Sequence, residues 1–277
     1  MVISGITNVV LNVIFVVAFN LGVAGVAIAT AISQAVSSSL VWFTLMKEDD
    51  ATKLIISRLK VDGDMALSII KIGIPAGIQS AVFSLSNVII QTSINSFDSS
   101  VIVAGNSVAS NLENFVYIGS MAFSQACITF TSQNVGANNK ARIKEIMYLT
   151  MALSVGSTLF LGVITWYFSD FFLGLYTSDP NVIDVGKIRM FWVALMLFLN
   201  IILDIFVSSV RGMGYSSLPT LLMIIGICGI RMAWLYTVFP IYNTLDAIYM
   251  CFPVSWIITS IIQGVLWVYC HRQLMKN

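Results

Sequence analysis

The chain has 277 residues, of which 58% are hydrophobic and only 10% are charged. A soluble domain carries about 25% charged and 45–50% apolar residues, so this composition excludes the soluble, disordered and nucleic-acid-binding classes. The formal net charge of +1 gives no reason to expect a polyanionic partner. The composition therefore indicates a polytopic membrane protein.

Eight apolar segments are long enough to cross a bilayer, which requires about 20 residues per helix. In chain order they are residues 2–19, 23–46, 69–97, 101–132, 143–168, 188–210, 218–240 and 247–270. A polar stretch, residues 47–64, separates the second from the third, and it fits a surface-lying helix and a solvated linker equally well. We predict an all-α integral membrane protein with eight transmembrane helices, two before this stretch and six after it.

Basic residues predict the orientation of these helices. If the helices alternate in direction, eleven of the 14 Lys and Arg residues fall on one side of the membrane. The opposite side receives only Lys187 and Arg189, and Arg231 lies inside a span. The eleven are Lys47, Lys53, Arg58, Lys60, Lys71, Lys140, Arg142, Lys144, Arg211, Arg272 and Lys276. Because basic loops stay in the cytoplasm, we expect both termini to be cytoplasmic.

Three charged residues, Glu113, Asp204 and Arg231, lie well inside predicted spans, away from their ends. An Asp, Arg or Lys at the centre of a membrane helix costs about 2.5–3.5 kcal/mol, so each charge needs a reason. A structural reason is a buried contact, such as a Glu113–Arg231 ion pair. A functional reason is ion coupling, for which Asp204 is the better candidate because Asn200 lies one turn away; Asp204 could exchange a proton or help to hold a cation.

Uncharged polar residues recur at helical spacing along three spans. The stripes are Ser80, Ser84, Asn87, Gln91 and Asn95; Asn106, Ser110, Glu113, Tyr117, Ser120 and Ser124; and Asn200, Asp204, Ser208 and Arg211. Lipid cannot hydrogen-bond these groups, so the stripes should face one another or water. Polar contacts between helices are the alternative, but they need one or two residues per helix. We favour a water-filled cavity between the third, fourth and sixth spans.

The residues that most enzymes and metal sites require are scarce. His271 is the only histidine, the four cysteines show no CxxC spacing, and no HExxH motif or catalytic aspartate pair near GxGD is present. We expect neither an enzyme nor a protein with a bound cofactor or metal.

Five short motifs occur in an order typical of one family. They are LGVAGVAIAT (residues 21–30), GIPAGIQ (73–79), AGNSVASNLEN (104–114), QNVGA (133–137) and RGMG (211–214). Each is weak by itself, but together the chain resembles the multidrug and toxic compound extrusion (MATE) family. The resemblance implies a twelve-helix antiporter with two six-helix lobes that exports amphipathic, often cationic drugs or toxic organic compounds in exchange for Na⁺ or H⁺.

The resemblance also implies an assignment of domains. Residues 1–46 are the last two helices of the N-terminal lobe, 47–66 are a cytoplasmic inter-lobe linker, and 67–277 are a complete six-helix C-terminal lobe. Because Met1 falls within a helix of the family pattern, we expect a truncated bacterial member that inserts into the inner membrane but exports nothing alone. Its partners would be small molecules and the lipid bilayer, without nucleic acid.

Candidate site residues follow from the stripes and the motifs. The ion-coupling candidates are Asp204, Asn200 and Glu113, and the cavity-lining candidates are Ser84, Asn87, Gln91, Asn111, Tyr117 and Ser120. The structural motif residues are Gly73, Pro75, Gln133, Asn134, Gly136, Arg211, Gly212 and Gly214. The chain departs from some family members, since its third span has no acid and Asn200 occupies the place of their second-lobe aspartate. The alternative is a flippase for lipid-linked oligosaccharides, which should carry several basic residues in its cavity.

Overall fold

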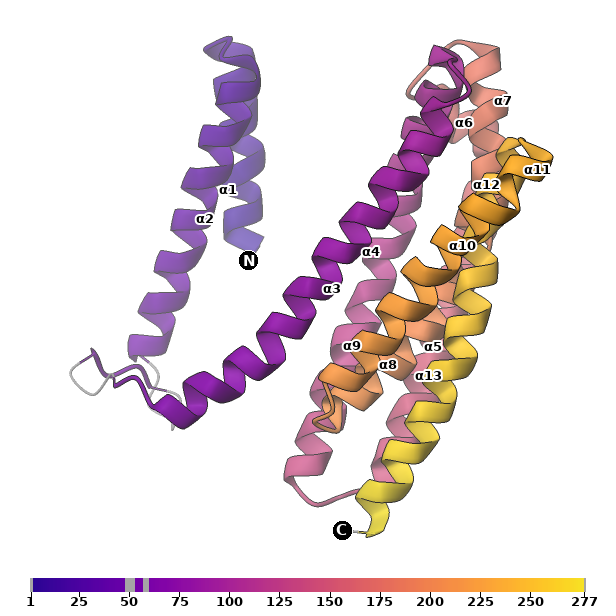
Figure 1. The fold of residues 1–277 in the computed structure, drawn as a ribbon. Helices are drawn as coiled ribbons and strands as arrows, with labels where there is room; N and C mark the ends of the chain where they lie inside the picture. Colours follow the sequence, from indigo (N-terminus) through magenta and orange to yellow (C-terminus); the bar gives the residue numbers. More distant parts are fainter. Residues whose placement is uncertain (1, 48–52, 57–59, 277) are drawn as a thin grey trace. The chain divides into compact units, whose positions relative to one another are not determined.

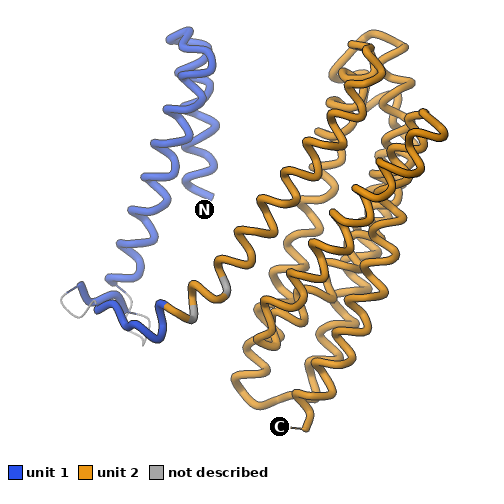
Figure 2. The backbone as a smooth tube through the Cα atoms, in the orientation of Figure 1, with its two compact units in different colours: residues 1–66 blue, residues 67–277 orange. Residues whose placement is uncertain are grey.

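The chain folds into helices joined by short connections. The computed structural model describes residues 2–47, 53–56 and 60–276, and these residues contain no β-strand. The prediction of an all-α protein is therefore confirmed over the described residues. The chain divides into two compact units, residues 1–66 and 67–277 (Figures 1 and 2).

Unit 1 is a helical hairpin. Helix α1 (Val2–Val13) continues through a π-helical stretch (Ile14–Ala18) and turns back into α2 (Gly22–Lys47). The Nδ2 of Asn8 donates a hydrogen bond across the hairpin to Ser33 Oγ at 3.1 Å. Of the predicted surface helix in the following stretch, residues 48–52 and 57–59 lie outside the described residues, and residues 53–55 have no regular secondary structure.

Unit 2 begins within α3 and holds the remaining helices. They are α3 (Gly63–Asn95), α4 (Ser100–Gly136), α5 (Ala141–Tyr167), α6 (Ser169–Gly174), α7 (Pro180–Arg189), α8 (Leu197–Gly212), α9 (Ser217–Met223), α10 (Ile230–Thr237), α11 (Phe239–Tyr242), α12 (Leu245–Tyr249) and α13 (Cys251–Lys276). Two π-helical stretches, Met190–Leu195 and Ile224–Gly229, join α7 to α8 and α9 to α10. Unit 2 is thus a bundle of long, locally widened helices (Figure 1).

Side-chain caps explain where several helices begin. Ser99 accepts a hydrogen bond from the backbone N–H of Ile102 at the start of α4, and Asp179 accepts one from Asn181 at the start of α7. Thr244 caps α12 in the same way. These polar residues lie between apolar runs in the sequence, which is why the helix ends were broadly predictable.

Close packing of α4 against α8 forms the centre of unit 2. A Cβ added to Gly212 would lie 2.6 Å from Thr131 Cβ, so only glycine allows this approach. Large apolar side chains from α4, α5, α8 and α13, including Ile143, Met147, Ile201 and Ile205, are almost completely buried. This core holds α4 and α8 in fixed positions beside the cavity described below.

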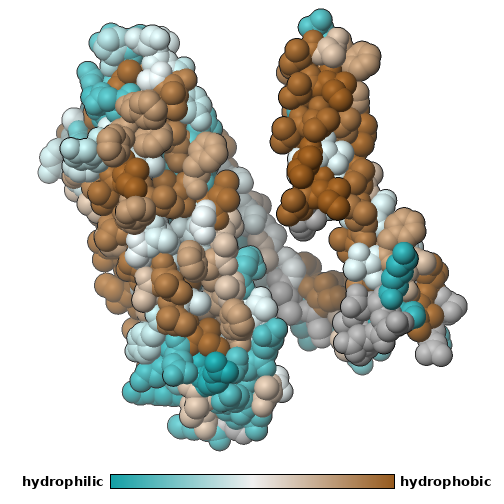
Figure 3. All heavy atoms as spheres, turned by 180° about the vertical axis from the view of Figure 1, so that it is seen from behind, coloured by the Kyte–Doolittle hydropathy of each residue, from teal (hydrophilic) through white to brown (hydrophobic). Residues whose placement is uncertain are grey.

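Six helical segments of the described residues are long and apolar enough to cross a membrane. They are Gly22–Lys47, Gly63–Asn95, Ala141–Tyr167, Pro180–Gly212, Ser217–Tyr242 and Leu245–Lys276. The other two predicted spans correspond to the shorter Val2–Ala18 and to α4, which is long but rich in polar residues, so the number eight stays a prediction. Apolar side chains cover much of the surface in Figure 3, and hydrophilic residues gather at the end of unit 2 where α13 finishes.

Candidate functional site

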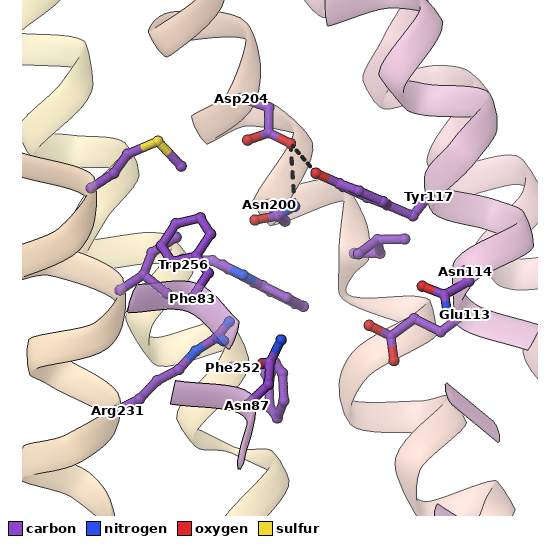
Figure 4. Close-up of a pocket in the computed structure, with 13 residues that line it drawn as sticks. Phe83, Asn87, Glu113, Asn114, Tyr117, Asn200, Asp204, Arg231, Phe252 and Trp256 are labelled. Atoms are coloured by element: carbon purple, nitrogen blue, oxygen red, sulfur yellow. Dashed lines mark hydrogen bonds between the residues drawn. The ribbon is translucent and has the colours of Figure 1, made fainter. Parts of the chain in front are cut away.

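A cavity of about 260 Å³ lies inside unit 2 (Figure 4). Its lining combines charged, amide and aromatic side chains from α3, α4, α8, α10 and α13, with Met223 and Ile227 beside them. The lining residues are Phe83, Asn87, Glu113, Asn114, Tyr117, Leu197, Asn200, Asp204, Met223, Ile227, Arg231, Phe252 and Trp256. Each of the three predicted polar stripes contributes to the lining. The stripe on α3 contributes Asn87, the stripe on α4 contributes Glu113 and Tyr117, and the stripe on α8 contributes Asn200 and Asp204.

Asp204 is held by neutral hydrogen-bond donors. The Tyr117 hydroxyl donates to Asp204 Oδ2 at 3.3 Å, and Asn200 Nδ2 donates to the same oxygen at 3.4 Å (Figure 4). Within the described part of the chain, no Lys, Arg or His nitrogen lies within 4.0 Å of this carboxylate, and Oδ1 accepts no hydrogen bond. The second oxygen of Asp204 is therefore available to a proton, a cation or a bound molecule.

Glu113 is neutralised by a different arginine from the one proposed above. Arg189 Nη2 lies 2.6 Å from Glu113 Oε2, and Arg189 Nε donates to the same oxygen at 3.2 Å. Arg189 Nη1 also donates to Asn106 Oδ1 at 2.7 Å, and only 7% of Arg189 is exposed. The proposed Glu113–Arg231 pair is thus wrong, because the end of α7 places Arg189 against α4.

Arg231 has no carboxylate partner among the described residues. Its Nε donates to Ser255 Oγ at 3.2 Å, and its guanidinium carbon lies 4.3 Å from the ring centre of Phe252 and 5.9 Å from that of Trp256. Figure 4 shows Arg231 on one side of the cavity with Asn87, and Asp204 on another. The cavity therefore carries separated positive and negative groups.

Four predicted cavity residues lie outside this lining. Gln91 accepts a hydrogen bond from Asn106 Nδ2 at 2.9 Å, and Ser120 bonds to the Thr158 hydroxyl on α5. Ser84 and Asn111 are exposed. The structure brings Asn87 and Tyr117 to the cavity, and a role for the other four in substrate contact stays a prediction.

Two of the motifs meet in space. Arg211 Nη2 donates to Gln79 Oε1 at 2.5 Å and to Thr220 Oγ1 at 3.1 Å, so RGMG is joined to GIPAGIQ. Gly214 has φ +95, a conformation that glycine adopts readily, and it forms the turn into α9.

The remaining motif residues have no contact with the cavity. In the QNVGA motif, Asn134 Nδ2 donates to the Phe130 carbonyl at 2.8 Å, and the Gln133 carbonyl accepts from the Ala137 N–H. Pro75 lies inside α3. Added Cβ atoms on Gly73 and Gly136 would meet nothing within 4 Å.

The sequence pattern did not reveal the ion partner of Glu113 or the aromatic side chains that line the cavity. The distribution of basic residues places Arg189 on the side of the membrane opposite the termini, although it is the second residue of the predicted span 188–210. Phe252 and Trp256 stand four residues apart on α13, a spacing that places both on one helix face and that could have suggested a shared contact. Among the described residues, no group of three His, Cys, Asp or Glu side chains is placed to hold a metal ion.

Long apolar helices around a cavity with buried charges define a multi-pass membrane protein of the transporter class. The MatE family model matches residues 75–237, which is more than half of the sequence, and the chain belongs to this family. Its members are transporters and not enzymes.

Relatives and solved structures agree with this assignment. The chain is 28% identical over 192 residues to the probable multidrug resistance protein YpnP of Bacillus subtilis, covering 68% of the chain and 42% of that protein. It is 24% identical over 240 residues to the probable multidrug resistance protein NorM of Thermotoga maritima, covering 84% and 51%. The fold resembles the bent form of the Vibrio cholerae MATE transporter VcmN, with a TM-score of 0.83, 19% identity, and coverage of 98% of this chain and 61% of that one. The chain thus spans about half the length of the curated relatives it matches.

Proposed function

We propose that the chain works in a multidrug efflux transporter that exports amphipathic, often cationic compounds in exchange for Na⁺ or H⁺. Membership of the MatE family and relatives named for multidrug resistance support this proposal. The observation that carries it is the cavity in which Asp204 has neutral donors and no cationic partner among the described residues. A flippase for lipid-linked oligosaccharides is not favoured, since Arg231 is the only basic side chain among the described residues that line this cavity.

In this proposal the two units belong to different lobes. Residues 67–277 form a six-helix lobe, residues 1–46 belong to the other lobe, and residues 47–66 link them on the cytoplasmic side. Transporters of this kind expose a shared site alternately to the two sides of the membrane by moving one lobe against the other. Basic residues at 140, 142, 144 and 272 support cytoplasmic termini, and the bacterial relatives support a place in a bacterial inner membrane.

Asp204 is the proposed coupling residue, with Asn200 and Tyr117 as its supports. A carboxylate that binds the coupling ion in one state and substrate in another allows one group to serve both steps. Glu113, the other acidic candidate, is already neutralised by Arg189 and is therefore assigned a structural role.

The test measures accumulation of a fluorescent amphipathic cation, ethidium, in bacteria that lack their own drug exporters. Two forms are expressed: the 277-residue chain by itself, and the chain fused to the part of the Thermotoga maritima relative that the match leaves uncovered. We expect the fused form, and not the chain by itself, to lower ethidium accumulation. In the fused form Asp204→Asn should abolish the effect, and Asp184→Asn, which changes an exposed acid, should retain it.

Everted vesicles identify the coupling ion, because the Na⁺ and H⁺ gradients can be collapsed separately. If neither form lowers accumulation, or if Asp204→Asn exports as well as the parent under both gradients, the proposal fails.

A further inference from the structure

Arg231 carries a positive charge that the described part of the protein does not neutralise. Only 7% of the residue is exposed, yet no carboxylate oxygen lies within 4.0 Å of its guanidinium. Its Nε donates to Ser255, but Nη1 and Nη2 donate no hydrogen bond to any described residue. Neither Nη atom is among the fully buried polar atoms that lack a partner in the described residues, so both donors reach the open space of the cavity, where an acceptor can approach them.

Neither acid of the cavity pairs with Arg231, because no carboxylate oxygen of the described residues lies within 4.0 Å of its guanidinium. Glu113 accepts two hydrogen bonds from Arg189, and Asp204 accepts from Tyr117 and Asn200. Figure 4 shows the guanidinium of Arg231 directed into the cavity, with Asn87 beside it and Asp204 on another wall. An acceptor for the free Nη donors therefore has to come from the cavity itself.

Aromatic side chains surround the same position. The guanidinium lies 4.3 Å from the Phe252 ring centre, and Phe83 and Trp256 also line the cavity. Contact with the Phe252 ring stabilises the cation, and it leaves the in-plane donors of the guanidinium open. Those donors can bond to two oxygens of a carboxylate or of a sulfonate, and the aromatic side chains can pack against an aromatic ring system.

We propose that Arg231 is the recognition site for an anionic group, and that the cavity binds small aromatic acids. The carboxylate or sulfonate accepts hydrogen bonds from Nη1 and Nη2, while the ring system lies against Phe83 and Trp256. This inference names a substrate class for the transport cavity and so rests on the proposed function. It adds anionic aromatic compounds to the cationic compounds that the family resemblance implies.

The test compares three probes that share one ring system and differ in charge. Purified chain in nanodiscs of neutral lipid is dialysed against 2-naphthoate, 2-naphthylmethanol or 2-naphthylmethylammonium, with empty nanodiscs as the blank. A charged hydrogen-bonded contact should make 2-naphthoate bind about tenfold to a hundredfold tighter than the neutral alcohol.

Four variants assign the effect to Arg231. Arg231→Gln should remove the preference for the anion, and Arg231→Lys should retain part of it. Asn87→Asp leaves Arg231 in place but sets a negative charge on the same side of the cavity, so it should also remove the preference. Arg142→Gln deletes an exposed positive charge on α5 and should change nothing. Asn87 is itself exposed, so its variant keeps the test valid if Arg231→Gln does not fold.

The proposal is overturned if 2-naphthoate binds no tighter than 2-naphthylmethanol, because water then supplies the acceptors for Arg231. Equal binding of 2-naphthoate to the parent and to folded Arg231→Gln or Asn87→Asp also overturns it. Because the assay measures binding and not export, loss of export with intact binding would refute the proposed function alone.

Discussion

Unit 2 contains two kinds of buried charge, and they differ in how they are satisfied. Glu113 and Arg189 neutralise each other at 2.6 Å, and Asn106 accepts a further hydrogen bond from Arg189. Asp204 and Arg231, in contrast, are held by hydroxyl, amide and aromatic groups, without an ion partner among the described residues. A buried charge by itself therefore does not mark a functional residue. A buried charge that forms no ion pair with any described residue is the one available to an ion or a ligand.

The largest expected effect is on the paired region. Glu113→Gln leaves Arg189 buried without a counter-charge, so the free energy of unfolding should fall by about 3–5 kcal/mol. Denaturant unfolding in mixed micelles measures it. Asp170→Asn is the control, since it removes an exposed pair with Lys187 and should cost less than about 1 kcal/mol. Equal losses in the two variants would remove the distinction between paired and surface charges.

The next effect concerns the contact that positions α8 beside α4. Gly212→Ala would place a Cβ 2.6 Å from Thr131 Cβ, and such overpacking should cost about 1–3 kcal/mol. Gly136→Ala, another motif glycine, adds a Cβ that meets nothing within 4 Å and should have little effect. The same unfolding assay compares the two, and equal stability of both variants would contradict the proposed packing role.

A smaller effect separates the cavity from the lipid-facing surface. In a cysteine-free background, Asn87→Cys and Asn200→Cys should react with a water-soluble thiol reagent at least about tenfold faster than Leu85→Cys, a difference of about 1.4 kcal/mol in barrier. Leu85 is 59% exposed in the protein, but we expect lipid to cover it. Faster labelling at Leu85 than at both cavity positions would mean that the cavity does not hold water.

The smallest effect is on the unpaired acid. Asp204→Asn keeps an acceptor for Tyr117 and breaks no ion pair within 4.0 Å among the described residues, so the free energy of unfolding should change by less than about 1 kcal/mol. This variant distinguishes the unpaired Asp204 from the ion-paired Glu113, because it should lose export while remaining stable. A loss as large as that of Glu113→Gln would assign Asp204 a structural role instead.

Much of the candidate site was predictable from helical spacing. Asn87, Tyr117, Asn200 and Asp204 were each identified by their positions on polar stripes, and the structure brings them to one cavity. A stripe is an approximation, however. The α3 stripe from Ser80 to Asn95 covers 15 residues in four steps, so its ends lie about 60° apart around a regular helix.

Other parts of the site could not be predicted from spacing. Between Arg189 and Leu197 the chain forms a π-helical stretch, in which the wider turn rotates every following side chain relative to a regular helix. The sequence shows no sign of such a stretch. Whether Arg189 or Arg231 faces Glu113 depends on this rotation and on how α7 packs against α4, and neither is a property of one helix.

The sequence by itself determined that the chain crosses a membrane as helices, that polar residues follow three of them, and that its motifs are those of one transporter family. These properties are local, since the cost of burying polar groups and the period of a helix act within single segments. Only the tertiary structure decided which charges neutralise each other and which face an open cavity. Coulombic and hydrogen-bond partners are chosen over a few ångströms between helices distant in sequence, and packing alone sets those distances.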